Sequence, residues 1–328
     1  MRPPVFDTFH EAYLEVLNEV ANRPDHVISS RGNRSRECRD ISFTLTDPRH
    51  RTPRLSSRKT NIVFNYAEAL WYLAGREDLD MIGYYAPRLY ALSLDGYHLT
   101  GTAYGARLFG PRGNSQWDRA VELLGKDPDS KRAAMVIMRP GEFADLDNPD
   151  VACTLALQFL IRDGRLHTTA FMRGNDAMLG LVCDVFSFTL IAEFTALQLG
   201  VPLGSYTHHV ASMHLNEPDW DRAAAILVEH APPPESSPVM PADTSWETLE
   251  TVLAWENQLR TNQGWFPVGS GVGLPPYWEQ VLLLFDVYRQ IKHHPSEPVD
   301  PAVLDALHAN HQWLVGCRWP EAMPQAGR

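Results

Sequence analysis

The sequence of 328 residues lacks any long run of apolar side chains. No run approaches the length of about 18 apolar residues that marks a membrane-spanning helix, so we expect no membrane span. Residues 1–7 contain an arginine and two prolines and lack the apolar stretch of a signal peptide. These two absences lead us to expect a cytoplasmic protein.

Positive charge is also scarce. The 29 lysines and arginines face 40 aspartates and glutamates, and the formal net charge is −11. This balance argues against a protein that binds the backbone of a nucleic acid. It remains compatible with a small anionic ligand that a local cluster of arginines holds.

Cysteine is rare, and its spacing excludes two classes of site. No two of the four cysteines form a CxxC pair, so we expect neither a zinc ribbon nor a redox dithiol. His208, His209 and His214 lack a cysteine or carboxylate at a spacing that fits a metal site, and we expect no metal. Free thiols agree with a cytoplasmic location.

The elements that are present predict a mixed α and β domain. Apolar residues recur at helical spacing in two segments, and one further helix is apolar all round, which is typical of a buried central helix. Two apolar strands flank an Arg-Asp-Gly turn and predict a β-hairpin. The helices are expected at residues 7–22, 62–75 and 181–199, and the strands at 154–161 and 165–172.

The chain divides at a proline-rich segment. Residues 231–242 hold five prolines and two serines and predict a linker. We expect a first domain over 1–230, a linker over 231–243 and a helical extension over 244–328 that packs on the same domain. Three helices are predicted in the extension, one that opens with a capping box from Thr244 to Glu247, one over 277–292 and one capped by Asp300.

Cys153 and Arg173 are candidates for nucleophilic chemistry. The turn between the two strands places both residues at the same end of the hairpin. A guanidinium beside a thiol favours the thiolate, which is the nucleophilic form. On spacing alone, a structural cysteine and a surface arginine remain the alternative.

Asp184 is unusual because it lies within the apolar helix. A buried aspartate needs either a buried partner or a ligand, and the sequence leaves both open. Four basic residues could converge on a phosphate, although each alone could be a solvated surface charge. They are Arg31, Lys131, Arg132 and Arg173.

Taken together and in order, these segments resemble the thymidylate synthase family over residues 12–217. The resemblance rests on YAEALWYLAG around Glu68, GTAYG around Tyr104, DPDSKR before residue 133, Cys153, and MRGNDAMLGLVCD over 172–184. It implies an α/β (α+β) thymidylate synthase-like fold with a mixed β-sheet and a buried central helix. The C-terminal helices would be additional to the family pattern.

The resemblance also implies the roles of the site residues. Cys153 would be the nucleophile, assisted by Glu68 and Tyr104. The co-substrate would be 5,10-methylenetetrahydrofolate, and the enzyme would be a homodimer in which Lys131 and Arg132 reach the partner's phosphate site. The other expected contacts are Arg31, Arg173 and Gly174 at the phosphate, Asp184 at the base, His214 and Asn216 at the sugar, and Asp176, Arg58 and Tyr90 at the folate.

The departures from the family pattern concern the substrate. Asp184 replaces the asparagine that reads uracil, and a carboxylate accepts a hydrogen bond from the amino group of cytosine but repels O4 of uracil. Gly174 and Lys131 replace a serine and an arginine at the phosphate, and Tyr90 replaces a tryptophan. Asn216 replaces a tyrosine and leaves room for a ribose 2′-OH.

These departures most resemble the cytidylate 5-hydroxymethylases of the family, such as those that act on CMP in mildiomycin-type nucleoside-antibiotic biosynthesis. We therefore expect CMP, and also dCMP, to be hydroxymethylated with methylenetetrahydrofolate and water. The alternatives are a phage-type dCMP hydroxymethylase, an ordinary thymidylate synthase and a catalytically silent nucleotide-binding homologue.

Overall fold

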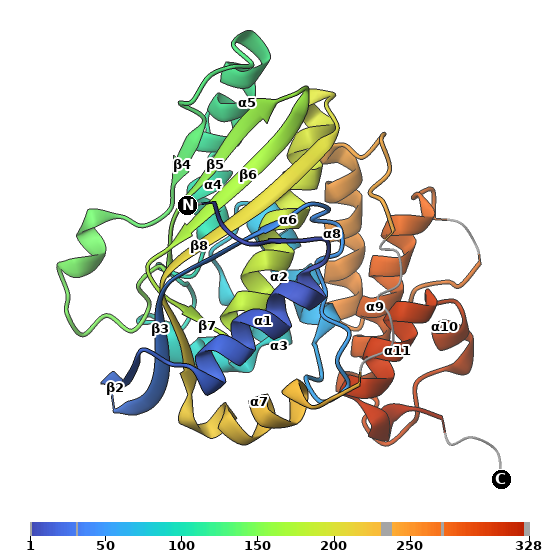
Figure 1. Cartoon of the computed structure of the whole chain (residues 1–328). Coiled ribbons are helices and arrows are strands. Elements are labelled where there is room, and N and C mark those ends of the chain that lie inside the picture. The colour runs from blue at the N-terminus through green and yellow to red at the C-terminus, as the bar shows by residue number, and fades with distance from the viewer. Residues whose placement is uncertain (1, 31, 231–237, 270–271, 325–328) are drawn as a thin grey trace.

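A mixed β-sheet forms the frame of the molecule (Figure 1). The computed structural model describes residues 2–30, 32–230, 238–269 and 272–324. The strands are ordered β1-β3-β8-β6-β5-β4, with β2 beside β3 and β7 beside β8. Their bounds are β1 Val5–Phe6, β2 His26–Ser30, β3 Asn33–Leu45, β4 Ala134–Val136, β5 Thr154–Arg162, β6 Arg165–Met172, β7 Asn175–Asp176 and β8 Leu203–Asn216.

The predicted hairpin is confirmed as β5 and β6. Asp163 and Gly164 both have positive φ, at 50° and 68°, which is the backbone that a tight two-residue turn requires. Arg162 therefore pairs directly with Arg165, and the strands run antiparallel from that end. β6 then pairs in parallel with β8, so the sheet is mixed, as expected.

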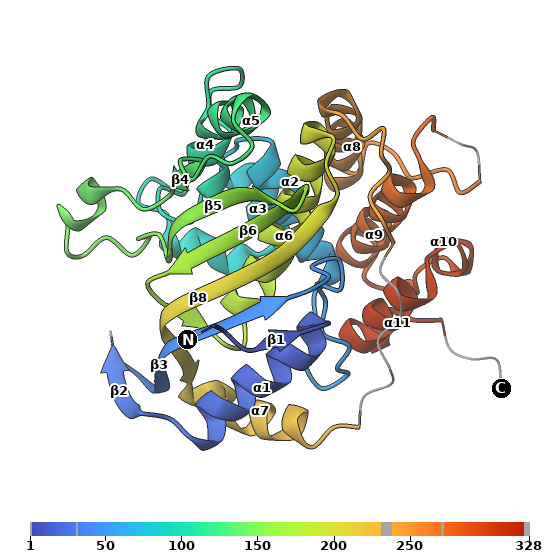
Figure 2. The ribbon, with the colours of Figure 1, turned by 45° about the horizontal axis from the view of Figure 1, so that its top comes forward.

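Helices gather on one face of the sheet and leave much of the other face open (Figure 2). The predicted first helix is observed as α1 (Phe9–Asn22), and the predicted central helix as α6 (Gly180–Leu199). Gly200 ends α6 in the left-handed conformation, at φ 67°. By length and composition α6 could cross a membrane, but most of it is buried within the core.

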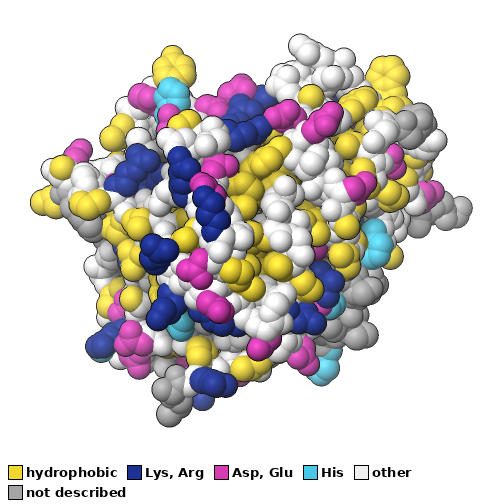
Figure 3. Space-filling model, turned by 90° about the horizontal axis from the view of Figure 1, so that it is seen from above, with side chains coloured by type: hydrophobic (Ala, Val, Ile, Leu, Met, Phe, Trp, Pro, Cys, Tyr) yellow, Lys and Arg dark blue, Asp and Glu magenta, His cyan; other side chains and the backbone are white. Residues whose placement is uncertain are grey.

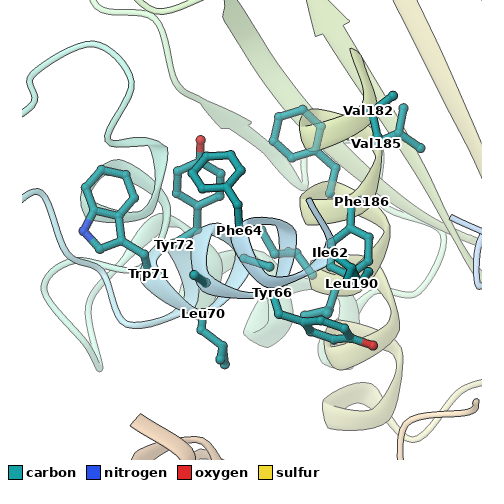
Figure 4. Packing of buried hydrophobic residues seen from close by; sticks show 14 of the residues in the cluster. Ile62, Phe64, Tyr66, Leu70, Trp71, Tyr72, Val182, Val185, Phe186 and Leu190 are labelled. Carbon is teal, nitrogen blue, oxygen red and sulfur yellow. The ribbon is translucent and has the colours of Figure 1, made fainter. Parts of the chain in front are cut away.

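The helix that carries Glu68 packs against α6. This helix is α2 (Ile62–Leu73), and every one of its residues is buried. Figure 4 shows apolar side chains of α2 facing Val182, Val185 and Phe186 of α6. Because both helices are buried, their polar side chains Glu68 and Asp184 are held in a shared apolar environment.

Shorter helices connect these elements, and further helices follow them. A single hydrophobic cluster extends from α1 to the C-terminal helices. The bounds are α3 Leu79–Tyr85, α4 Tyr104–Leu108, α5 Gln116–Lys126, α7 Trp220–Leu227, α8 Trp246–Arg260, α9 Pro276–His293, α10 Pro301–Asp305 and α11 Ala309–Arg318, with 3₁₀ turns at Pro87–Leu92, Pro140–Phe143, Glu217–Asp219 and Pro320–Ala322.

Two details of the predicted C-terminal helices are wrong. The first helix is capped by Ser245 with Thr248, not by Thr244 with Glu247. The Thr244 hydroxyl instead accepts a hydrogen bond of 3.1 Å from the indole of Trp278, because α9 packs against this corner. The third helix is capped by Asp300, as predicted, but it divides into α10 and α11. Most of the predicted linker, residues 231–237, lies outside the described residues.

Candidate active site

Cys153 and Arg173 lie together at the open end of the β5–β6 hairpin. The Arg173 side chain donates hydrogen bonds to the carbonyl oxygens of Ala152 at 2.8 Å and Val151 at 2.9 Å. These two bonds hold the guanidinium so that Nη2 lies 3.7 Å from Cys153 Sγ. The thiol is half-buried and forms no disulfide with another described cysteine. A fixed positive charge beside a partly accessible thiol favours a nucleophilic thiolate.

Tyr104 begins α4 and lies close to the same cysteine. Its ring is buried and stacks on Tyr72 with a centroid distance of 5.2 Å. Burial raises the pKa of Tyr104 well above its usual value, despite its hydrogen bonds to the Thr154 side chain and the Cys153 backbone. The phenol is therefore a neutral hydrogen-bonding group at the mouth of the thiol site.

Glu68 and Asp184 form a pair of buried carboxyls between α2 and α6. Burial, and then the charge of Asp184, raise the pKa of Glu68 to about 8. Burial raises the pKa of Asp184 to about 7. The Ser187 hydroxyl donates a hydrogen bond of 3.2 Å to Glu68. A carboxyl with a pKa near neutrality can both give and take a proton, which suits Glu68 for general acid–base work.

Asp184 has a protein partner that the sequence analysis did not identify. Nδ2 of Asn175 donates a hydrogen bond of 2.7 Å to Asp184 Oδ2. Oδ1 of the same Asn175 side chain lies 3.4 Å from Nε2 of His208, and Nδ1 of His208 lies 2.7 Å from the Tyr206 hydroxyl. The only signal in the sequence was the alternation along β8, which places Tyr206 and His208 on the buried face.

Three of the predicted contacts, Asp176 to the folate and His214 and Asn216 to the sugar, form a second group on β7 and β8. Asp176 pairs with His214 in the parallel β7–β8 ladder. Oδ1 of Asp176 accepts two backbone hydrogen bonds just before α6, and Oδ2 of Asp176 accepts a hydrogen bond of 2.6 Å from Asn216 Nδ2. Oδ1 of Asn216 accepts 2.7 Å from the Ser35 hydroxyl. Both halves of the Asn216 amide thus already have protein partners.

The other predicted residues occupy different surroundings. Arg58 is buried, and its Nη2 donates 2.6 Å to the carbonyl oxygen of Met178. Tyr90 is 49% exposed, with its ring against Gly83. A Cβ at Gly174 would lie 3.7 Å from the Ser212 carbonyl oxygen, which is ordinary contact, so space does not demand glycine there.

Two of the predicted phosphate ligands lie apart from Cys153 and Arg173. Lys131 and Arg132 are exposed just before β4, at the edge of the sheet, and no described contact joins their side chains to Cys153. Arg31 lies outside the described residues. Within the part of the chain that the structure describes, no group of three histidine, cysteine or acidic side chains could hold a metal ion.

Comparison with known proteins identifies the class to which this arrangement belongs. The thymidylate synthase family model matches residues 9–251. A deoxyuridylate hydroxymethyltransferase of Bacillus phage SP01 is 32% identical over 222 residues, which are 64% of this chain and 57% of the phage protein. A protein of the same name from Delftia phage PhiW-14 is 29% identical over 201 residues, 58% of this chain and 55% of that protein.

A third relative matches over almost its whole length. It is a putative thymidylate synthase of Methanothermobacter marburgensis, 26% identical over 221 residues, which are 67% of this chain and 96% of that protein. The chain spans little more than half the length of the two phage proteins. Because the family model covers most of it, the chain belongs to the thymidylate synthase family. The expectation of a thymidylate synthase-like fold is confirmed.

Proposed function

We propose that this protein is a cytidylate 5-hydroxymethyltransferase, which converts CMP, and also dCMP, to the 5-hydroxymethyl nucleotide. Methylenetetrahydrofolate and water would be consumed and tetrahydrofolate released. The observation that carries the proposal is the buried carboxyl of Asp184, held by Asn175 at the position where the family reads the pyrimidine. A carboxylate accepts a hydrogen bond from the 4-amino group of cytosine and repels O4 of uracil.

The Cys153 thiolate would add to C6 of the pyrimidine and make C5 nucleophilic. Arg173 favours that thiolate, with Nη2 3.7 Å from Sγ. Glu68, whose pKa is raised to about 8, would carry protons to and from the base and remove the proton at C5. Tyr104 would donate a hydrogen bond within this pocket. C5 would bond to the one-carbon unit of the folate, and loss of the C5 proton would break the bond to the folate nitrogen, release tetrahydrofolate and leave an exocyclic methylene on C5. Water would add to that methylene, and the electrons returned to C5 would then expel the Cys153 thiolate from C6.

The folate would supply the one-carbon unit. Arg58 fits an anionic folate side chain, because it is buried and its Nε has no hydrogen-bond partner among the described residues. Asp176 would meet the pterin, and Tyr90 would border the reacting carbon. A half-exposed tyrosine at that position would admit water, whose addition distinguishes hydroxymethyl transfer from hydride transfer.

The open sheet face supports a homodimer. Figure 3 shows hydrophobic side chains gathered across the middle of the face toward which Figure 2 turns the sheet. Leu155, half-buried Phe171 and half-buried His209 line a hollow there, and the Phe171 and His209 rings stack at 5.4 Å. If a second copy covers this face, Lys131 and Arg132 can reach the partner's phosphate site, beside Arg31 and Arg173 there.

Four further parts of the proposal rest on the sequence and its resemblance to the family. His214 and Asn216 would contact the ribose, although the Asn216 amide must then share its present bonds to Ser35 and Asp176. Gly174 would leave room at the phosphate. A cytoplasmic location and a role in nucleoside-antibiotic biosynthesis are likewise proposed.

The names of the phage relatives favour a second candidate, hydroxymethylation of deoxyuridylate. One experiment separates the two functions. The protein is incubated with methylenetetrahydrofolate and, in turn, CMP, dCMP, UMP and dUMP, and the products are weighed by mass spectrometry. A hydroxymethyl product from the cytidylates alone is expected. A methyl product, or a product from the uridylates alone, would overturn the proposal.

A further inference from the structure

Four buried polar side chains form a line that ends at Asp184. Tyr206 and His208 lie on β8 and are fully buried, Asn175 on β7 is 2% exposed, and Asp184 on α6 is 7% exposed. The separations along the line are 2.7 Å, 3.4 Å and 2.7 Å. Buried polar groups that are all satisfied tend to hold one arrangement, so the line is a candidate for fixing how Asp184 is presented.

The charge of Asp184 determines the direction of these hydrogen bonds. An ionised carboxylate only accepts, so Asn175 must turn its amide NH₂ toward Asp184 and its Oδ1 toward His208. His208 must then carry its proton on Nε2, which leaves Nδ1 to accept from the Tyr206 hydroxyl. Burial lowers the pKa of His208 to about 3, so the imidazole is neutral and has a single N–H to place.

We propose that Asn175 and His208 are positioning residues for base selection, through which the fold holds Oδ2 of Asp184 and leaves Oδ1 for the 4-amino group of cytosine. This inference rests on the proposed function. Without the His208 donor, the Asn175 amide can rotate by half a turn and present its oxygen to the carboxylate. That orientation repels the ionised form of Asp184 and so removes the charge on which cytosine selection depends.

The other groups around Asp184 do not stabilise its ionised form. Glu68 and Tyr72 on α2, Tyr104 on α4, Cys183 on α6 and Tyr206 on β8 all interact electrostatically with it. Burial raises the pKa of each of them, which favours their neutral forms. Among the described residues, Asn175 makes the hydrogen bond that favours the ionised carboxyl.

The test compares two substitutions of His208. In His208→Gln, the amide can still donate to Asn175 from nearly the same place as Nε2, whereas His208→Leu fills the space without a donor. The full-length variants are titrated with CMP and UMP by calorimetry from about pH 6 to about pH 9. We expect His208→Gln to keep the parent's preference for CMP. In His208→Leu the preference for CMP over UMP should fall about tenfold, which corresponds to the loss of one neutral hydrogen bond. The pH midpoint, which is the pH at which this preference reaches half of its full value, should move upward.

A second variant keeps the test valid if a His208 variant fails to fold. Asn175→Ala is expected to behave like His208→Leu, and thermal unfolding of each variant shows whether the fold is retained. If both His208 variants keep the parent's preference and pH midpoint, the positioning role is wrong. If the parent itself binds CMP no better than UMP, the proposed base specificity fails instead. The pH at which the dissociation constant of whichever nucleotide binds changes by half then still shows whether His208 controls the ionisation of Asp184.

Discussion

The proposed nucleophilic role of Cys153 depends on how Arg173 is held rather than on the presence of an arginine alone. The carbonyl oxygens of Val151 and Ala152 accept from two arms of the guanidinium, so the fork cannot turn away from Sγ. The same principle applies to Asp184, whose charge depends on burial and on one amide donor. At the scale of the residue, the orientation of a neighbouring side chain therefore determines whether the Cys153 thiol and the Asp184 carboxyl are ionised.

Cys153→Ala should abolish turnover and leave nucleotide binding intact, because the thiolate forms a covalent bond only during the reaction. We expect kcat to fall by about 10⁴ or more, with the dissociation constant for CMP within about threefold of the parent. Single-turnover assays and calorimetry measure the two quantities. Near-normal product formation would remove Cys153 from the role of nucleophile.

Asp184→Asn should admit uridylates. An amide presents both a donor and an acceptor to the base, which complements uracil. A mismatched buried hydrogen bond costs ~1–3 kcal/mol, so the ratio of kcat/KM for CMP to that for UMP should fall by roughly 10- to 100-fold. The four nucleotides are compared under identical folate concentrations. An unchanged ratio would mean that another residue reads the base.

Base selection should also depend on pH. Below the Asp184 pKa of about 7, the neutral acid can donate to O4 of uracil, and above it the carboxylate cannot. The preference for CMP over UMP should therefore be weak near pH 6 and rise toward about pH 8.5. Dissociation constants for both nucleotides across this range test the prediction, with Asp184→Asn as the control that should show no such rise.

At the scale of the element, close helix packing holds the proposed catalytic groups. α4 and α2 touch at Gly105, where an added Cβ would lie 2.3 Å from the Tyr72 carbonyl oxygen. α2 also carries Glu68, and α4 begins at Tyr104. The contact between the two main chains at Gly105 therefore sets the spacing of Glu68 and Tyr104, both proposed as catalytic side chains.

Gly105→Ala should destabilise the protein and disturb that spacing. The new methyl group meets backbone rather than a flexible side chain, so we expect at least about 1–3 kcal/mol of lost stability and a lower kcat. Gly125→Ala is the matched control, since it lies exposed in α5 with nothing within 4 Å. That change should be neutral or stabilising by roughly 0.5–1 kcal/mol. Chemical denaturation gives both values, and equal effects at the two sites would contradict the packing argument.

At the scale of the whole molecule, the predicted phosphate ligands lie apart within one chain. Arg173 points to Cys153, whereas Lys131 and Arg132 are exposed at the edge of the sheet. The open face between these groups could be covered by a second copy. A dimer would then assemble the phosphate site from two chains, with the negative net charge of −11 offset locally by arginine.

Mixing two inactive variants should restore activity if the sites are composite. Cys153→Ala lacks the nucleophile, and Arg132→Glu lacks the donated phosphate ligand. After the subunits exchange, half of the dimers are mixed, and each mixed dimer has one complete site, so about a quarter of parental activity is expected. Activity no greater than the sum of the separate variants would show that each site is built from one chain.

What the sequence by itself determined lies mostly within short stretches of chain. The Asp163-Gly164 turn specified the hairpin and placed Cys153 and Arg173 at the same end of it. A register shift between Thr154 and Ala156, which the turn does not specify, then sets Cys153 directly opposite Arg173. The apolar helix and its Gly200 stop could likewise be predicted, because local periodicity and backbone freedom express them.

Tertiary structure alone decided the partners of the polar side chains. Asn175 lies on β7 and His208 on β8, and only the folded chain brings the Asn175 side chain between His208 and Asp184 of α6. The division of the third predicted helix into α10 and α11, and the shift of the first helix's cap to Ser245, also follow from packing of the C-terminal helices. Such contacts join residues distant in the chain, and no local pattern records which buried polar group will satisfy which other.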